Sequence, residues 1–321
     1  MNEKVEITKD RVIEDLKQLG MSKGDHVGVA LSFKSIGYVK GGPDAFIDAL
    51  LETVGPKGTI MMPAFTKSFP ISKTKSGKIE YIFDYKLTPS YTGLVPNAFL
   101  KRTNTIRSHH PINSVAALGK FAKYLTKDHD ENSRPFIPYS RLTKLNGKIM
   151  CVGIGDRIVA IRHEAQDQAG LLNIVPLKRG TKFRDSDGIV KIYKGTVIAG
   201  CAARLHELVP NFRKMGFVID GKIGMAKSVV VSAKKFLEYT TGMLKDDPSL
   251  NLCTRISCLW CRELERRLEL YDNIENPKYF QKYIVVRKII ATINFFRLRD
   301  SKLIVPLRLI MRIRDALQRF L

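Results

Sequence analysis

Two short segments combine imidazole with other polar groups in a way that could support acid–base chemistry. The first is Arg107-Ser-His-His-Pro111, in which the proline favours a loop or an extended segment. The second is Arg162-His163-Glu164, which follows a glycine-bearing strand end, where open α/β sheets bind ligands. Histidine has an ordinary pKa close to neutrality, so either segment could supply a general base. A polar surface turn and an exposed helix start are the simpler interpretations.

A third segment, Lys40-Gly41-Gly42, forms a glycine-bearing turn before an expected helix. Free backbone N–H groups and the positive end of the helix dipole make such a turn suitable for anions. It has neither the Walker nor the Rossmann spacing, and Gly-Gly turns before helices are common. Phosphate binding and a purely structural turn therefore both remain open.

The five cysteines indicate reduced thiols rather than a metal site. The spacing Cys253-x4-Cys258-x2-Cys261, with Cys201 as a fourth member, could suggest a cluster, but no His or carboxylate completes a familiar zinc spacing. The odd number and the absence of an apolar leader at the N-terminus favour free thiols in a cytoplasmic protein. We therefore expect no metal.

The net charge of +23 and the pI of about 9.8 allow several partners. Nucleic acid, an anionic membrane or phosphorylated ligand, and a lysine-rich proteome are the competing explanations. Residues 254–321 hold 15 Lys and Arg against 7 Asp and Glu, so the excess is enriched there without being confined there. No recognised nucleic-acid motif is present, and we expect no nucleic-acid partner.

Hydrophobic patterning supplies the elements that would position these groups. Buried strands are expected at 25–31, 58–63 and 148–154, and helices at 8–19 and 45–54. Strands that alternate with helices predict an α/β domain, here 1–253. Residues 67–82 are polar and are expected to form an exposed loop. Residues 254–321 are expected to form a basic amphipathic helical extension.

Taken in order, several short motifs resemble the aminoglycoside 3-N-acetyltransferase family over roughly residues 5–253. The matches include Leu19-Gly20, Gly24-Asp25, Ser32, Ile36-Gly37, Gly41-Gly42, Gly58-Thr59, Phe83-Asp84, Thr88-Pro89-Ser90, Gly93, Arg107-Ser108, His110-Pro111, Ser114, Gly119, Gly147-Lys148, Gly153 and Asp247-Pro248. His163 and Ala165 resemble the family's His-x-Ala-Glu motif. The resemblance implies an α/β/α sandwich and acetyl transfer from acetyl-CoA to an amine by direct attack, without a metal.

The resemblance also implies roles for individual residues. His163 is expected to be the general base, and His110 is expected to shape the same cleft. Thr88 or nearby backbone N–H groups would stabilise the thioester oxyanion. The coenzyme-binding set is expected to comprise Ser32, Lys40, Gly41, Gly42, Ser108 and Ser114, with the Lys40 turn at the phosphates.

Four positions depart from the family pattern. Ala30 replaces a His, Ile137 a Ser, Ala160 a Thr, and Gln166 the Glu of His-x-Ala-Glu. Gln166 can orient a ring nitrogen but cannot stabilise an imidazolium as a carboxylate would, and Glu164 is expected to substitute in part. These changes favour an acceptor other than the ordinary aminoglycosides, and they leave loss of activity open.

The basic charge then favours an anionic acceptor. Aminoglycosides are polycations, and their sites are expected to be acidic, whereas a nucleotide-linked amino sugar is an anion. We therefore expect acetylation of an amino sugar in surface-polysaccharide synthesis. The alternatives are an aminoglycoside 3-N-acetyltransferase and a catalytically inactive binding protein.

The tail suggests a second kind of contact. A basic apolar helix within 283–321 could lie on the inner face of the cell membrane. Packing on the core or on a second subunit, which would make a homo-oligomer, is the alternative.

Overall fold

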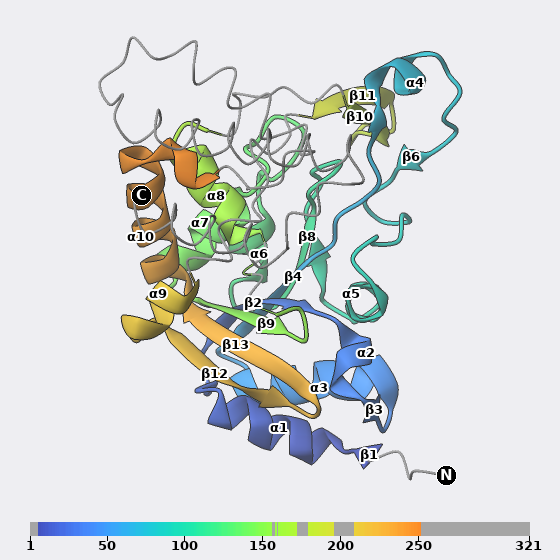
Figure 1. Ribbon diagram of the computed structural model, residues 1–321. Coiled ribbons are helices and arrows are strands. Elements are labelled where there is room, and N and C mark those ends of the chain that lie inside the picture. Colours follow the sequence, from blue (N-terminus) through green and yellow to red (C-terminus); the bar gives the residue numbers. More distant parts are fainter. Residues whose placement is uncertain (1–5, 156–157, 159, 172–178, 196–208, 252–321) are drawn as a thin grey trace, which may run out of the picture.

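The centre of the computed structural model is a mixed sheet of seven strands (Figure 1). In order they are β12 (Val218–Ile223), β13 (Ala226–Ser232), β9 (Lys148–Val152), β2 (His26–Leu31), β4 (Thr59–Pro63), β8 (Val115–Gly119) and β7 (Ile106–Arg107). The structure describes residues 6–155, 158, 160–171, 179–195 and 209–251. β2 pairs in parallel with β4 and β9, and antiparallel strands continue the sheet on both sides.

Helices cover both faces of this sheet and confirm the predicted α/β/α sandwich. One apolar core lies between the sheet and α1 (Lys9–Gln18), α3 (Gly42–Val54) and α5 (Leu94–Leu100). The other lies against α6 (Ala122–Thr126), α7 (Ile137–Lys144), α8 (Ile161–Gln168), α9 (Val209–Lys214) and α10 (Ala233–Asp246), which η2 (Pro248–Asn251) follows. Alternate residues of β4, β8, β9 and β13 enter opposite cores, as the twofold period of a strand requires.

Local sequence signals account for the helix ends. The Thr8 hydroxyl accepts a hydrogen bond from the Arg11 N–H at 3.2 Å and caps α1. α3 has a proline in its first turn and ends at Gly55, whose φ of 63° closes the helix. Both helices lie where the sequence predicted them.

The prediction for 67–82 is right in that most of this segment is exposed, but wrong in that it is not a loop throughout. This segment contains β5 (Phe69–Pro70), α4 (Ile71–Lys75) and the start of β6 (Ile82–Phe83). With β10 (Arg179–Arg184) and β11 (Val190–Gly195), β5 and β6 form a second, small sheet beyond the main one (Figure 1). The pairing partners lie about a hundred residues further along the chain, so local polarity could not reveal them.

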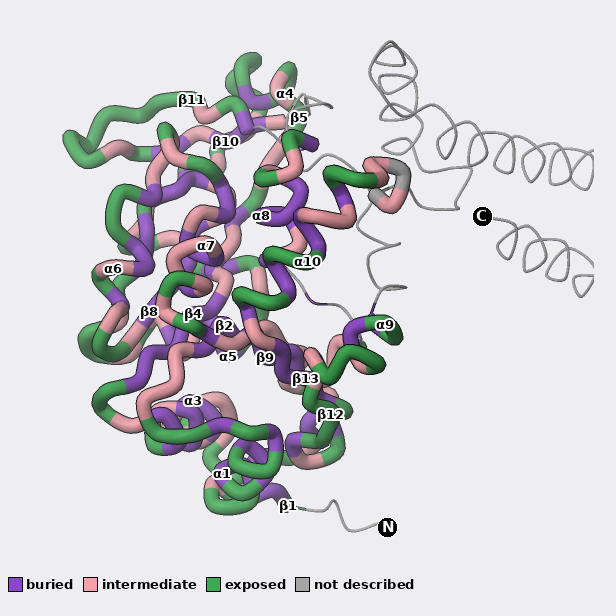
Figure 2. The backbone as a smooth tube through the Cα atoms, turned by 90° about the vertical axis from the view of Figure 1, so that its left-hand side faces the viewer, coloured by how far each residue is buried: buried purple, intermediate pink, exposed green. Residues whose placement is uncertain are grey.

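Two short elements lie beside the main sheet. α2 (Phe33–Ile36) follows β2, and a parallel pair of β1 (Glu6–Ile7) and β3 (Tyr38–Val39) precedes α3. Figure 2 shows the central strands and the inner sides of α7, α8 and α10 as buried, and β11 as largely exposed. The predicted helical extension, 254–321, lies outside the described residues.

A close backbone contact between β4 and β8 explains one glycine. Gly119 has a φ of 118°, and a Cβ there would lie 2.3 Å from the Gly58 carbonyl oxygen. Gly93 has nearly the same φ, 117°, but a Cβ there would meet nothing within 4 Å. Alanine substitutions at these two glycines therefore distinguish the cost of a positive φ, which both share, from the cost of steric overlap, which only Gly119 has.

We expect Gly119→Ala to lower the free energy of unfolding by about 3 kcal/mol, because overpacking adds to the cost of a positive φ. Gly93→Ala should lose only about 1–2 kcal/mol, the cost of the positive φ alone. Urea unfolding followed by circular dichroism measures both. Equal losses would show that the contact at Gly119 relaxes freely.

Candidate active site

His163 lies in the first turn of α8, the helix that follows the central strand β9. The chain leaves β9 through Gly153 and Gly155, both with positive φ, and enters the helix from Ala160. Ala160 has a φ of 70°, a strained conformation for a residue with a Cβ. Such strain is often found at functional sites, where the surrounding structure holds it in place. Here it precedes the helix that carries the predicted base.

A single hydrogen bond fixes the imidazole of His163. Its Nδ1 lies 2.7 Å from the Gln166 side-chain oxygen, which can only accept, so Nδ1 carries the proton. Nε2 therefore keeps its lone pair and is the nitrogen that can take up a proton. The ring contacts Phe136 with centroids 5.1 Å apart, and the side chain is 8% exposed. Burial lowers the pKa of His163 to about 3, Arg162 adds to the effect, and the bond to Gln166 opposes it.

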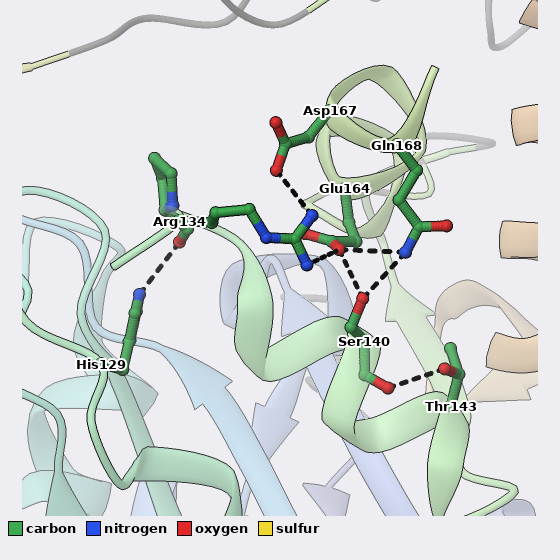
Figure 3. A network of polar contacts seen from close by, with 8 residues as sticks. His129, Arg134, Ser140, Thr143, Glu164, Asp167 and Gln168 are labelled. Carbon is green, nitrogen blue, oxygen red and sulfur yellow. Dashed lines mark hydrogen bonds and ion pairs between the residues drawn. The ribbon is translucent and has the colours of Figure 1, made fainter. Parts of the chain in front are cut away.

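Glu164 does not contact His163, although the two are neighbours in sequence. Its Oε1 accepts hydrogen bonds from the hydroxyl of Ser140 on α7 and from Gln168 Nε2 at 3.1 Å, and it lies 3.0 Å from the Arg134 guanidinium (Figure 3). Burial raises the pKa of this fully buried carboxyl, and its polar neighbours oppose that rise. The prediction that Glu164 partly replaces the carboxylate of the family motif is therefore not supported, because its side chain is engaged with α7 and Arg134.

His110 is also buried and neutral. Its Nδ1 accepts from the backbone N–H groups of Ile112 and Asn113 at 3.2 and 3.0 Å, so the proton is on Nε2. Nε2 in turn donates to the hydroxyl of Tyr193 on β11 at 3.3 Å. Burial lowers the pKa of His110 to about 3. Tyr193 joins the small sheet to the loop that carries His110, and no signal in the sequence connected the two.

His129, which the sequence did not single out, lies between the two predicted histidines. Its Nε2 donates to the Pro135 carbonyl at 3.1 Å, and its Nδ1 accepts from the Ser108 hydroxyl at 2.9 Å. The centroid of its ring lies 4.9 Å from that of His110. Pro135 is followed by Phe136, whose ring contacts His163. Burial holds the pKa of His129 well below its ordinary value. A chain of contacts through His129, Pro135 and Phe136 thus links His110 to His163, which do not contact each other directly among the recorded interactions of the described residues.

Ser108 and Ser114 are not available to a coenzyme, contrary to prediction. Ser108 accepts from the Val115 N–H at 2.9 Å while it donates to His129. Ser114 donates to the Ala64 carbonyl at 2.6 Å. Both side chains are buried. The Ser114 hydroxyl instead fixes the start of β8 against the end of β4, and the Ser108 hydroxyl joins the start of β8 to His129.

Arg107 is a buried cation held by neutral acceptors. It donates to the carbonyls of Ala64 at 2.9 Å, Thr88, and Tyr85 at 3.5 Å, and to the Ser114 hydroxyl at 3.2 Å. Burial lowers the pKa of Arg107 to about 10, so it stays charged at neutral pH. It therefore ties the loop after β6 to the main sheet.

Thr88 lies in this loop and lines an open cleft of about 580 Å³, called the basic cleft below. The cleft is lined by Tyr85, Lys86, Leu87, Thr88, Pro89, Asn97, Leu100, Lys101, Thr105 and Arg107, a set without a carboxylate. The Thr88 hydroxyl accepts from the Asp84 N–H at 2.8 Å. No contact between Thr88 and His163 is recorded among the described residues.

The remaining coenzyme residues lie elsewhere. Ser32 follows β2, and its hydroxyl lies 2.9 Å from that of Ser35. Gly41 and Gly42 begin α3, on the face of the sheet opposite α8. Lys40 beside them is exposed and forms an ion pair with Glu6 at 3.0 Å.

Comparison with known proteins decides the family. The aminoglycoside 3-N-acetyltransferase family profile matches residues 29–245. Aminoglycoside N(3)-acetyltransferase VII of Streptomyces paromomycinus is 32% identical over 269 residues, which cover 75% of this chain and 92% of the relative. The chain belongs to the aminoglycoside 3-N-acetyltransferase family. A type III enzyme from Salmonella sp. is 27% identical over 72% of this chain and 89% of its own.

Solved structures agree with this assignment. The apoenzyme of the aminoglycoside acetyltransferase AAC(3)-IVa has a TM-score of 0.70 at 24% identity and covers 83% of this chain and all of its own. AAC-IIIb, solved as a binary complex with CoASH, has a TM-score of 0.63 at 25% identity and covers 75% of this chain and 97% of its own. Family membership confirms the predicted N-acetyltransferase and its donor, acetyl-CoA.

The expectation of a small-molecule amino-sugar acceptor is supported, but the expected role in polysaccharide synthesis is wrong. The matched relatives are aminoglycoside acetyltransferases, so the nucleotide-linked acceptor loses its support. The reasoning failed because the net charge of a whole chain does not give the local field at one site. Within the described residues, no helix is long and apolar enough to cross a bilayer, and no cluster of three or more metal-ligating side chains occurs. Membrane docking of 283–321, oligomerisation and a cytoplasmic location remain predictions.

The three buried histidines predict that stability falls below pH 6.5. Their folded pKa values lie below the unfolded value, so their contribution is complete above pH 6.5 and is lost as the unfolded chain takes up protons. At pH 5.5 the loss is about 1.4 kcal/mol for each histidine. Glu164 and Asp167, whose pKa values burial raises, act in the opposite direction.

Urea unfolding at pH 7.5 and 5.5 measures this loss. His110→Asn is the matched variant, because an amide oxygen can accept the same backbone N–H groups without titrating. It should remove about a third of the histidine effect. A loss in His110→Asn as large as that in the native protein would contradict the neutral assignment of His110, because the carboxyl groups contribute equally to both.

Proposed function

We propose that this protein transfers the acetyl group of acetyl-CoA to the 3-amino group of an aminoglycoside, with His163 as general base. The observation that carries the proposal is the fixed tautomer of His163, whose Nδ1–H bond to Gln166 leaves Nε2 to accept a proton. Family membership supports the reaction and the class of acceptor. Related structures hold sisomicin in AAC-VIa, and apramycin in AAC(3)-IVa.

The proposed step is a direct attack. The amine nitrogen bonds to the thioester carbonyl carbon while its proton passes to His163 Nε2. The carbon–sulfur bond then breaks, and the sulfur leaves as the thiol with the proton from the imidazolium. General base catalysis of this kind contributes about 10²–10⁴-fold. Thr88 remains our proposed donor to the developing oxyanion, which would replace the long bond of 3.5 Å that its hydroxyl now donates to the Ile82 carbonyl.

Gln166 sets the strength of this base. A neutral amide orients the ring as a carboxylate would, but gives the imidazolium less electrostatic stabilisation. Burial and Arg162 lower the pKa of His163 more than the bond to Gln166 raises it, so the base is unprotonated throughout the physiological range. The acceptor amine must therefore reach the thioester in its neutral form, and His163 takes up its remaining proton only as the new bond forms.

We expect His163→Ala to lower kcat/KM at least 100-fold with an accepted aminoglycoside, because the proton acceptor is lost. Gln166→Glu should raise the rate about tenfold and raise the pKa of His163, moving an acid limb of the pH profile towards neutrality. Release of the CoA thiol, measured from pH 5 to 8 with sisomicin, apramycin and gentamicin, tests both. A loss below tenfold in His163→Ala would exclude it as the base.

We further propose that the phosphates of the donor bind at the basic cleft rather than at the Lys40 turn. Lys40 is already paired with Glu6, whereas Lys86, Lys101 and the buried Arg107 line a cleft without carboxylates. A polycationic acceptor would be repelled there, and an anionic donor attracted. Ser32 remains a proposed coenzyme contact, and this proposal replaces the predicted phosphate contacts of Gly41 and Gly42.

Replacing both Lys86 and Lys101 with Ala should raise KM for acetyl-CoA about tenfold, because two favourable charge contacts with phosphate are lost. KM for acetyl-pantetheine, which lacks the nucleotide, should not change. Lys40→Ala is the matched control and should leave both KM values within about twofold. A raised KM for acetyl-CoA in Lys40→Ala, with no change in the double variant, would show instead that the phosphates bind at the Lys40 turn.

A further inference from the structure

Arg134 connects the segment just before α7 to α8, the helix that carries the proposed base. Its guanidinium lies 3.0 Å from Glu164 Oε1 and 3.0 Å from Asp167 Oδ2, both on α8. Glu164 is completely buried and Asp167 is mostly buried, whereas the Arg134 side chain is 46% exposed. Figure 3 shows the arginine reaching from the chain before α7 across to both carboxylates.

The residues that follow Arg134 contact the histidines directly. Pro135 accepts the hydrogen bond from His129 Nε2, and the Phe136 ring lies against His163. The same short segment therefore anchors α8 through its charge and supports the ring of His163 through its aromatic side chain. A displacement of Arg134 would move both supports together.

The spacing along α8 explains how an anchor at Glu164 can affect His163. Arg134 binds positions 164 and 167, and the internal hydrogen bond joins positions 163 and 166. These are two i,i+3 pairs displaced by one residue, or about 100° around a helix of 3.6 residues per turn. Fixing the first pair to the chain before α7 fixes the rotation of α8, and so the direction of the second pair.

The anchor at Glu164 is reinforced from α7 and from α8 itself. Oε1 of Glu164 also accepts from Ser140 and Gln168, and Gln168 Nε2 donates to the Ser140 hydroxyl at 2.9 Å. Arg134 brings the positive charge to this buried group, which otherwise has only neutral donors there. Without that charge, the Glu164 carboxylate would become protonated or would move towards solvent. Either change would weaken the contacts that fix the rotation of α8 about its axis.

We propose that Arg134 is a positioning residue for the reaction, which sets the direction of the His163 imidazole by holding Glu164 and Asp167. It does not touch the reacting atoms. This role rests on the proposed function, because it assumes that His163 is the base.

The test compares Arg134→Gln with a matched control, Arg11→Gln. Arg11 forms an ion pair at 2.9 Å with Asp15, which is 2% exposed, but on α1 at the opposite face of the sheet. Each variant removes a partly exposed arginine from a buried carboxylate, and Arg134→Gln removes the contact with Asp167 as well. Their melting temperatures should fall by similar amounts.

Only Arg134→Gln should lower kcat, by about 30-fold, with KM for acetyl-CoA and for the aminoglycoside within about threefold. Arg134→Lys, which keeps the charge but loses the fork that reaches both carboxylates, should recover part of the loss. Asp167→Asn, which removes one of the two contacts, should lie between Arg134→Gln and the native enzyme. It also provides a milder variant if Arg134→Gln does not fold. Equal kcat losses in Arg134→Gln and Arg11→Gln would show a merely structural role and overturn the proposal.

A measurement that needs no activity separates this proposal from the proposed function. Nitrogen-15 NMR of labelled histidine reports which ring nitrogen of His163 carries the proton. Native enzyme and Arg11→Gln should show the Nδ1–H form alone, and Arg134→Gln a mixture of tautomers. An unchanged spectrum in Arg134→Gln overturns the positioning role. Failure of the native enzyme to acetylate any aminoglycoside would instead reject the proposed function.

Discussion

Parallel pairing of β2 with both β4 and β9 is the constraint on which the arrangement of the active site depends. Parallel strands require crossover connections, and these place helices on the two faces of the sheet. The carboxyl ends of the three strands consequently lie along one edge. The chain leaves β9 at that edge to form α8, and so places His163 near the end of a buried central strand. The antiparallel strands that extend the sheet then position the loop with His110.

The histidines of this site are buried and uncharged. Each of the three histidines His110, His129 and His163 has one nitrogen that donates and one that can accept, and the partners of each determine which. A protonated ring would lose an accepted hydrogen bond in His110 and His129, and would be poorly solvated in all three. The region is therefore organised around neutral imidazoles. The charged groups Arg134, Glu164 and Asp167 lie on the neighbouring side of α8.

Sequence patterning predicted the elements better than it predicted the contacts. The strands at 25–31, 58–63 and 148–154 and the caps of α1 and α3 follow from local periodicity and from Thr8 and Gly55. Helical geometry also separates Gln166 from Glu164, since a residue three positions on shares a helix face with His163 and the next residue does not. Other contacts join positions far apart in sequence, which local patterning does not reveal. They are the pairing in the small sheet, the bond from His110 to Tyr193, and the ion pairs of Arg134 with Glu164 and Asp167. His129 lies in a run of charged residues that resembles an ordinary surface segment.

Arg107 has a consequence for how this scaffold could change over time. Most of its partners are main-chain oxygens, at Ala64, Tyr85 and Thr88, so it recognises the path of the backbone rather than the side chains along it. Arg107 thus places no constraint on the side chain at position 85, whereas Ala64 is buried and Thr88 is the proposed oxyanion donor. A wall of the basic cleft could acquire new chemistry through single substitutions, without loss of the cation that holds it. Diversification of ligand preference within one fold becomes accessible by that route.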